Sequence, residues 1–119
     1  MGTLTMSRTA LPELDLARIK RFCDERVAVH LRDKIRIKME VQGRAVTMEC
    51  RPPWTPVIGP EWTRLPVARL RHVAARGEWE LFWCDRNLRW HRYDLIKPSR
   101  HVEALLAEID ADPTSIFWG

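Results

Sequence analysis

Cysteine and histidine side chains are the first candidates for chemistry in this chain, as metal ligands or as a nucleophile with its base. They lie at wide spacing, as Cys23, Cys50, Cys84, His30, His72, His91 and His101. None forms the close Cys-x-x-Cys or His-x-x-x-His pair that chelates a metal from one local segment. Only Cys84 and His91 could become neighbours, across a tight turn. We therefore expect no metal site and no cofactor, and interpret the thiols as buried or half-buried structural groups.

Nucleophilic catalysis is the second possibility. A cysteine nucleophile needs a nearby histidine or other cation to form a thiolate, and Cys84 with His91 would meet that need. No glycine-rich oxyanion loop accompanies the pair. The 5 glycines are also too scattered to cradle a phosphate, which excludes a nucleotide-hydrolysing site of that type.

Carboxylates are the third possibility, for acid–base or nuclease chemistry. The candidates are Glu49, Glu80, Asp85 and Asp94. Strand alternation predicts Arg36 opposite Glu49 and Arg71 opposite Glu80, so cross-strand charge pairs on a solvated face explain these acids better than a metal-binding cluster. A weaker enzyme alternative uses a site around Glu49, Arg51, Trp54 and Arg69.

Cations and aromatic rings share one face of the predicted sheet. The set comprises Lys34, Arg36, Lys38, Arg51, Arg69, Arg71, Phe82, His91 and Tyr93. Cations that follow phosphates and rings that stack on bases suit a single-stranded nucleic acid. Arginine, tyrosine and phenylalanine also suit a protein interface. The glutamates on the same face dilute the positive field, which favours a solvated face with ion pairs over a nucleic-acid site.

The chain has 6 tryptophans, and they fall into two groups. Parity along the strands turns Trp79, Trp83 and Trp90 toward the helices, which predicts core positions. Trp54 and Trp62 lie on a proline-rich loop over residues 52–64. That loop either forms a ligand cleft or is pinned over the sheet edge by its indole rings, and we favour the second.

The elements that position these residues follow from hydrophobic periodicity. Apolar residues at helical spacing predict a helix over 12–26 and another after Ser99, which is a plausible N-cap, ending at Asp112. Alternating residues predict strands over 33–41, 45–51 and 66–73 and two strands within 78–93. Residues 1–10 are expected to be a flexible tail before a single domain over 11–119.

Three hairpin connections set the predicted register. A two-residue loop at 42–43 would pair Met39 with Val46. A four-residue turn at 74–77 would pair His72 with Trp79. A two-residue turn near Asn87 would then place Trp90 and Arg92 on the face of Trp83, whereas a three-residue loop would swap the last strand.

Bulk properties agree with a small globular protein. The 119 residues suffice for one core, and 45% of them are hydrophobic. No apolar run reaches the length of a membrane span. The odd cysteine count fits a reducing compartment, so we expect a soluble, cytoplasmic protein. The net charge of +4 permits an anionic partner without requiring one.

Several ordered motifs resemble those of a bacterial family known only as a domain of unknown function (number three-zero-two-four). They are Arg-Pro-Pro-Trp at 51–54, Glu-Trp-Thr at 61–63, Trp-Glu-Leu-Phe-Trp-Cys-Asp-Arg-Asn at 79–87, Trp-His-Arg-Tyr at 90–93, and Asp-Ala-Asp-Pro-Thr-Ser-Ile-Phe-Trp-Gly at 110–119. The resemblance spans about residues 11–119 and implies a short, usually standalone bacterial protein with no established activity. This chain departs at Leu88, where the family pattern usually has glycine, and leucine tolerates positive φ poorly.

Together these observations predict an α+β domain of order α-β-β-β-β-β-α, with a five-stranded antiparallel sheet and both helices on one face. The leading functional hypothesis is a non-enzymatic binding module for a protein partner or a second copy of itself. The alternative is a single-stranded nucleic-acid binder using the same face. The predicted binding residues are Arg36, Glu49, Arg51, Trp54, Trp62, Arg69, Arg71, Phe82, His91 and Tyr93.

Overall fold

The computed structural model describes residues 11–26, 36–51 (the side chain of Arg51 excepted) and 65–118. The elements, in order, are α1 (Glu13–Arg26), β1 (Arg36–Gln42), β2 (Ala45–Arg51), β3 (Leu65–Val73), β4 (Glu78–Cys84), β5 (Trp90–Arg92) and α2 (Val102–Ala111). The strands form one antiparallel sheet of order β1-β2-β3-β4-β5. The predicted α+β class and element order are confirmed.

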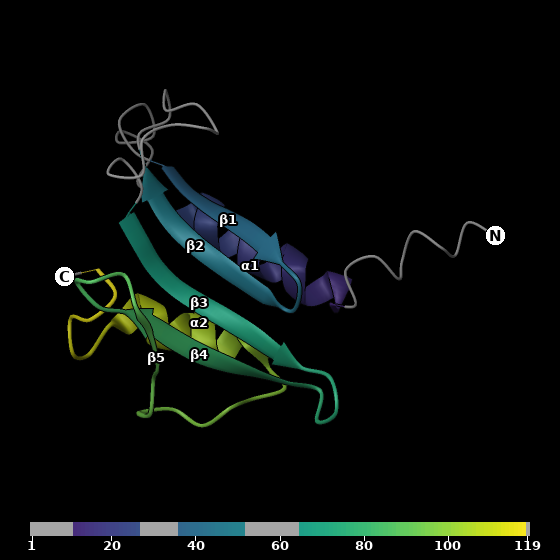
Figure 1. The fold of residues 1–119 in the computed structure, drawn as a ribbon. Coiled ribbons are helices and arrows are strands. Elements are labelled where there is room, and N and C mark those ends of the chain that lie inside the picture. The colour runs from purple at the N-terminus through teal and green to yellow at the C-terminus, as the bar shows by residue number, and fades with distance from the viewer. Residues whose placement is uncertain (1–10, 27–35, 52–64, 119) are drawn as a thin grey trace.

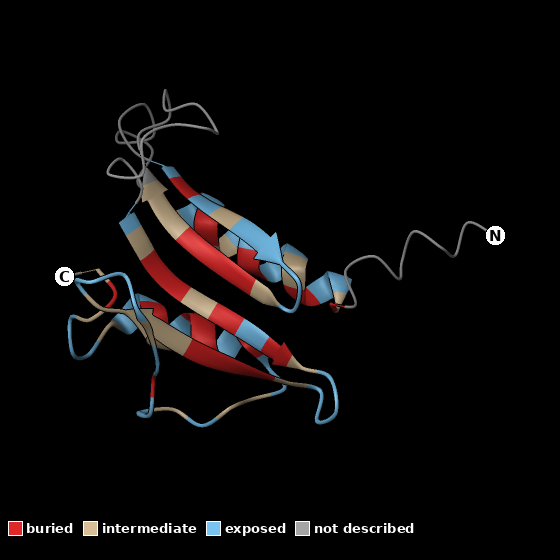
Figure 2. Cartoon of the chain, viewed as in Figure 1, coloured by how far each residue is buried: buried red, intermediate tan, exposed pale blue. Residues whose placement is uncertain are grey.

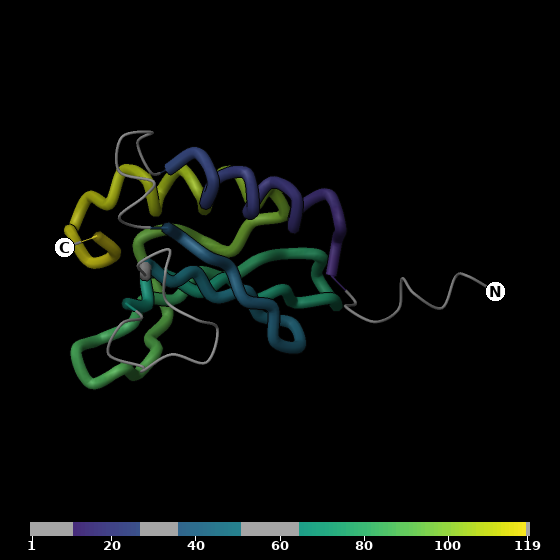
Figure 3. Tube along the Cα trace, turned by 90° about the horizontal axis from the view of Figure 1, so that it is seen from above, coloured from purple at the N-terminus to yellow at the C-terminus, as the bar shows by residue number. Residues whose placement is uncertain are grey.

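Both helices lie on the same face of the sheet (Figures 1 and 3), where α1 contacts β1, α2 contacts β4, and the helices contact each other. Their apolar residues are spaced three or four apart, so each helix buries one stripe. Ile19 and Cys23 in α1 are buried, as are Leu105 and Ile109 in α2. Among the described residues, no element covers the opposite face, which we call the outer face.

The core lies between the helices and the inner face of the three central strands, where buried positions concentrate (Figure 2). These strands contribute Val46, Met48, Ala68, Leu70, Trp79 and Leu81. β1 is less covered: on its inner face only Ile37 is buried, and Val41 is 37% exposed. The apolar residues predicted to face inward are therefore among the buried ones, although a register shift between β2 and β3 buries Val67 as well as Ala68, and coverage declines toward the β1 edge.

The hairpin between β1 and β2 keeps its predicted faces but not its predicted register. The two-residue loop is 43–44 rather than 42–43. Gly43 has φ +59 at the first loop position, where tight hairpins of the type II′ pattern need a positive φ. A loop at 42–43 would have put a glutamine there. Met39 therefore faces Met48, two residues beyond its predicted partner.

The hairpin between β3 and β4 has its predicted register. His72 lies opposite Trp79 and Leu70 opposite Leu81, across a four-residue turn that ends at Gly77 with φ +63. Glycine closes such a turn without the steric cost that a side chain would bring.

The connection between β4 and β5 is a three-residue loop, not the predicted two-residue turn. The backbone N–H of Asp85 donates to the carbonyl of Arg89 at 2.9 Å, which leaves residues 86–88 as the loop. Its last residue, Leu88, has φ +63. A three-residue loop that ends in a left-handed residue is a common hairpin type, and its odd length reverses the faces of the following strand.

The prediction that Trp90 shares a face with Trp83 is therefore wrong. Cys84 lies opposite Trp90, and Trp83 lies opposite His91. Beyond β5, the N–H of Tyr93 donates to the carbonyl of Leu81 at 2.8 Å, and its ring is buried on the helix side.

The start of α2 also differs from prediction, since the N-cap is His101 and not Ser99. Ser99 exchanges two backbone hydrogen bonds with Trp79, at 2.7 and 3.0 Å, so its backbone extends the sheet. Its hydroxyl oxygen accepts a hydrogen bond from the N–H of His101.

The end of α2 binds the C-terminal segment back onto the domain. Asp112 follows the helix with φ +42, and its carboxylate accepts hydrogen bonds from the N–H groups of Ile116, Phe117 and Trp118 at 2.8, 3.0 and 2.9 Å. Phe117 is buried against Tyr93, with ring centroids 5.0 Å apart.

Candidate binding face

A row of side chains crosses the outer face of the sheet, one from each strand. Strand pairing aligns Glu40, Thr47, Arg69, Phe82 and Arg92 in that order. Along the row, an acid, a hydroxyl and an arginine are followed by the aromatic ring of Phe82 and a second arginine. Because directly opposed side chains on one sheet face are neighbours, the row forms a continuous surface.

Arg69 makes two contacts on this face. Its Nε donates to the hydroxyl oxygen of Thr47 at 3.0 Å, and its guanidinium carbon lies 4.3 Å from the ring centroid of Trp90. A guanidinium stacked on an indole is attracted by the ring electrons as well as by contact. Trp90, Arg69 and Phe82 are each only partly buried, so this cluster presents planar groups to solvent.

Glu80 lies beside the row and has its charge compensated. Its side chain is 11% exposed, and its carboxylate pairs with Arg76 at 3.4 Å and Arg92 at 3.6 Å. Arg71 lies opposite Glu80 as predicted, but no ion pair joins them among the described residues.

The predicted pairing of Arg36 with Glu49 is wrong. The two-residue register shift places Arg36 opposite Arg51 and Glu49 opposite Lys38. Both predicted residues remain on the outer face, at the β1–β2 side, apart from the cluster around Arg69.

His91 and Tyr93 lie on the helix side, so the reversed last strand removes them from the predicted outer face. His91 stacks on Trp83 with centroids 4.7 Å apart, and its Nε2 is 2.7 Å from Oδ2 of Asp85. That hydrogen bond, with those from backbone N–H groups of the loop, lowers the pKa of Asp85. The Tyr93 hydroxyl donates to Glu108 at 2.6 Å.

The reversed face of the last strand also separates Cys84 from His91, which were the candidate pair for thiol chemistry. Cys84 points outward and His91 toward the helices, so they form neither a nucleophile pair nor a metal corner. Burial raises the pKa of Cys84 and Cys50, and that of Cys23 to about 12, which keeps the thiols protonated near neutral pH. Within the described ranges, no three acidic, histidine or cysteine side chains converge as metal ligands.

The structure thus brings together only part of the predicted set, namely Arg69 and Phe82. Sequence reasoning missed Trp90, Arg92 and Thr47. The signal for the first two was the loop: an expected glycine at the position of Leu88 indicates a left-handed residue and hence a three-residue connection. Trp54, Trp62 and the side chain of Arg51 lie outside the described residues.

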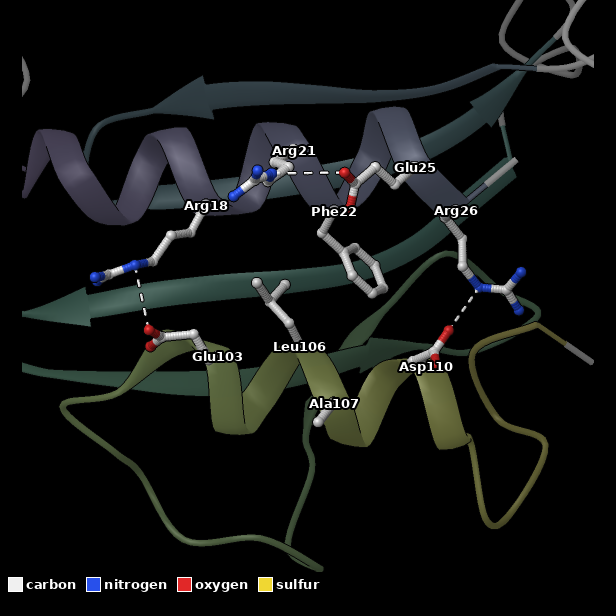
Figure 4. A pocket seen from close by; sticks show the side chains of 9 residues that line it. All are labelled: Arg18, Arg21, Phe22, Glu25, Arg26, Glu103, Leu106, Ala107 and Asp110. Carbon is white, nitrogen blue, oxygen red and sulfur yellow. Dashed lines mark ion pairs between the residues drawn. The ribbon is translucent and has the colours of Figure 1, made fainter. Parts of the chain in front are cut away.

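A groove of about 660 Å³ runs between α1 and α2 (Figure 4). Ion pairs span it, from Arg18 to Glu103 at 3.2 Å and from Arg26 to Asp110 at 3.1 Å. The ring of Phe22 projects into it. Because these cations bind acids of the facing helix, we interpret the groove as the seam that joins the two helices.

Comparisons with known proteins give one family and no individual relative. A family model described as "Domain of unknown function (DUF3024)" matches residues 6–119. Neither the comparison with curated proteins nor that with solved structures found a significant match. No helix in the described part of the chain is long and apolar enough to cross a membrane.

Proposed function

The chain belongs to the DUF3024 family, whose description names no activity, and we propose that it is a non-enzymatic module that binds an acidic protein segment through the outer sheet face. One observation carries this proposal: partly buried Trp90 and Phe82 alternate with Arg69 and Arg92 on a face that no described element covers. Tryptophan and arginine are the side chains most enriched at the energetic centres of protein interfaces.

Charge on this face supports an acidic partner. The carboxylate of Glu80 is already paired, whereas Arg71 has no ion-pair partner among the described residues. Among the described residues, Arg69 makes a hydrogen bond to a hydroxyl and stacks on an indole ring, so its guanidinium keeps donors for a carboxylate. A partner segment that carries aspartate or glutamate beside an apolar residue would satisfy both the cations and the rings.

Single-stranded nucleic acid is the competing class, and the geometry favours it less. The guanidinium of Arg69 already covers one face of the Trp90 indole, so a base could stack only on the other face. Glu40 and Glu49 lie on the same face and would repel a phosphate backbone.

The test is a selection of phage-displayed random peptides on the full chain, followed by fluorescence anisotropy with the enriched peptides. We expect acidic sequences with an aromatic residue, whose affinity falls about tenfold or more in R69A and R92A. R21A is the matched control, because Arg21 lies on α1 at the other face.

Equal affinity for R69A, R92A and the original chain would overturn the proposal. Binding of single-stranded oligothymidylate that weakens steeply with salt, without acidic peptides being enriched, would establish the nucleic-acid alternative instead.

We also propose a cytoplasmic location, supported by three free cysteines that form no disulfide with one another. Fractionation of the native cell checks this, and recovery in an oxidising compartment would contradict it.

A further inference from the structure

The edge of β1 has backbone groups that no described strand pairs. The N–H of His72 donates to the carbonyl of Arg44 at 2.9 Å, so even-numbered residues of β2 bond toward β3 and odd-numbered ones toward β1. On β1, the alternation then leaves Ile37, Met39 and Val41 with N–H and C=O groups directed away from the sheet.

The inner face of this edge is incompletely covered. Val41 is 37% exposed, whereas Val46 opposite it is fully buried, and Met39 is half-buried. Figure 2 shows the same contrast between β1 and the central strands. A further strand beside β1 would both pair its backbone and cover these side chains.

We propose that two copies of this chain pair through β1 in antiparallel fashion, with Met39 on the two-fold axis, to form one continuous ten-stranded sheet. Met39 then lies opposite Met39 of the second copy, and Ile37 opposite its Val41. Lys38 lies opposite Glu40 of the second copy, and this ion pair occurs twice. A symmetric interface of this kind needs a self-complementary surface, which this strand provides.

Charge selects this register over its neighbours. A shift of the pairing by two residues places Lys38 opposite Lys38, or Glu40 opposite Glu40, at the axis. A shift by one residue pairs inner-face with outer-face residues, such as Ile37 with Glu40. Charges on an edge strand usually oppose pairing. Here the Met39-centred register is favoured because it joins two opposite-charge pairs and no like-charge pair, whereas the register centred on Lys38 gains Arg36 opposite Glu40 but opposes the two Lys38 side chains. Lys38 has no ion pair within the described residues that would compete.

The inference is independent of the proposed outer-face function, because it uses the backbone edge of β1, which is two strands away from Arg69 on β3 and at the opposite edge from Trp90 on β5. Sedimentation velocity of the full chain over a range of concentrations tests it. We expect the original chain to approach twice the mass of one chain. K38E and E40K should each weaken the dimer about tenfold, since two attractive pairs become repulsive.

Charge exchange makes the test specific. The double variant K38E/E40K restores the opposite charges and should dimerise like the original chain. An equimolar mixture of K38E and E40K should form heterodimers, because every pair across that interface is again of opposite sign. K97E, at an exposed position outside the sheet, is the matched control and should leave the dimer unchanged.

A chain that stays monomeric at high concentration would overturn the inference, as would a mixture of K38E and E40K no more associated than either variant alone. R69A should leave the dimer intact, so loss of peptide binding with an intact dimer would count against the outer-face function alone.

Discussion

The indole N–H of Trp79 donates a 2.8 Å hydrogen bond to Oδ2 of Asp15, joining the start of β4 to the first turn of α1. Trp79 is fully buried and Asp15 is 9% exposed. The other carboxylate oxygen of Asp15 accepts from Arg18 at 2.9 Å, and His72 lies edge-on to the indole with centroids 4.9 Å apart. This contact satisfies the polar atom of the largest fully buried side chain and places the helix over the sheet.

Loss of that hydrogen bond should destabilise the fold strongly. We expect Asp15→Ala to lower the free energy of unfolding by about 2–3 kcal/mol, because it leaves a buried indole N–H without its charged acceptor. Trp79→Phe removes the donor, and the two effects should be non-additive in a double-mutant cycle by urea denaturation. Glu25→Ala, which removes an exposed ion pair on the same helix, should cost about 0.5 kcal/mol or less. Additive effects of the first two substitutions would show that the hydrogen bond contributes little.

The loop between β4 and β5 should be stabilised by glycine. Leu88 has φ +63 and is 60% exposed, so its side chain adds steric cost and little burial. We expect Leu88→Gly to raise the free energy of unfolding by about 0.5–1 kcal/mol, measured by thermal or urea unfolding. Asn87→Gly is the control, since Asn87 is not among the positive-φ residues, and it should stabilise nothing. A destabilised L88G variant would contradict the left-handed conformation at this position.

The carboxylate of Asp112 should control protection of the C-terminal amides. In Asp112→Ala, we expect hydrogen exchange at Ile116, Phe117 and Trp118 to accelerate by about tenfold or more, because each amide loses its acceptor. Asp112→Asn retains Oδ1, which serves Ile116 and Phe117, and replaces Oδ2, which serves Trp118. In the asparagine variant, hydrogen exchange should therefore accelerate mainly at the amide of Trp118. Uniform loss of protection in both variants would argue against separate roles for the two oxygens.

Tyr93 is the only tyrosine of the chain, so ultraviolet absorbance reports its ionisation alone. Burial, followed by the hydrogen bond to Glu108, raises its pKa from 10.0 to about 12. Because the folded-state pKa exceeds the unfolded value, protonated Tyr93 contributes to the free energy of unfolding. That contribution is complete below pH 10 and is lost as the pH rises through about 12. Glu108→Gln removes a neighbouring negative charge, and the titration midpoint should fall. An unchanged midpoint would mean that Glu108 does not hold the hydroxyl.

Local patterns were sufficient for most of the fold. Helical stripes and strand alternation predicted the element order, the single-sided helix layer and the inward faces of β1 to β4, because side-chain direction repeats with a short, local period. Among the candidate site residues, the same reasoning placed Arg69, Arg71 and Phe82 on the outer face.

Which residues form the binding face depended on loop length, which the local periodicity of the strands does not determine. A single residue more or less in the loop at 86–88 reverses the last strand, and only the continued hydrogen bonding of Asp85 to Arg89 decides its length. The resulting three-residue loop directs Trp90 to the outer face, where it contacts Arg69, and directs Tyr93 to the helix side, where it is buried.

Sequence by itself therefore determined which elements form and which side of β1 to β4 is apolar. Tertiary structure decided how strands join, and which distant groups meet. Asp15 and Trp79 are 64 residues apart, and nothing in their own segments selects one for the other. They pair because a buried indole N–H must find an acceptor, and the packing of α1 on the sheet brings that carboxylate within reach.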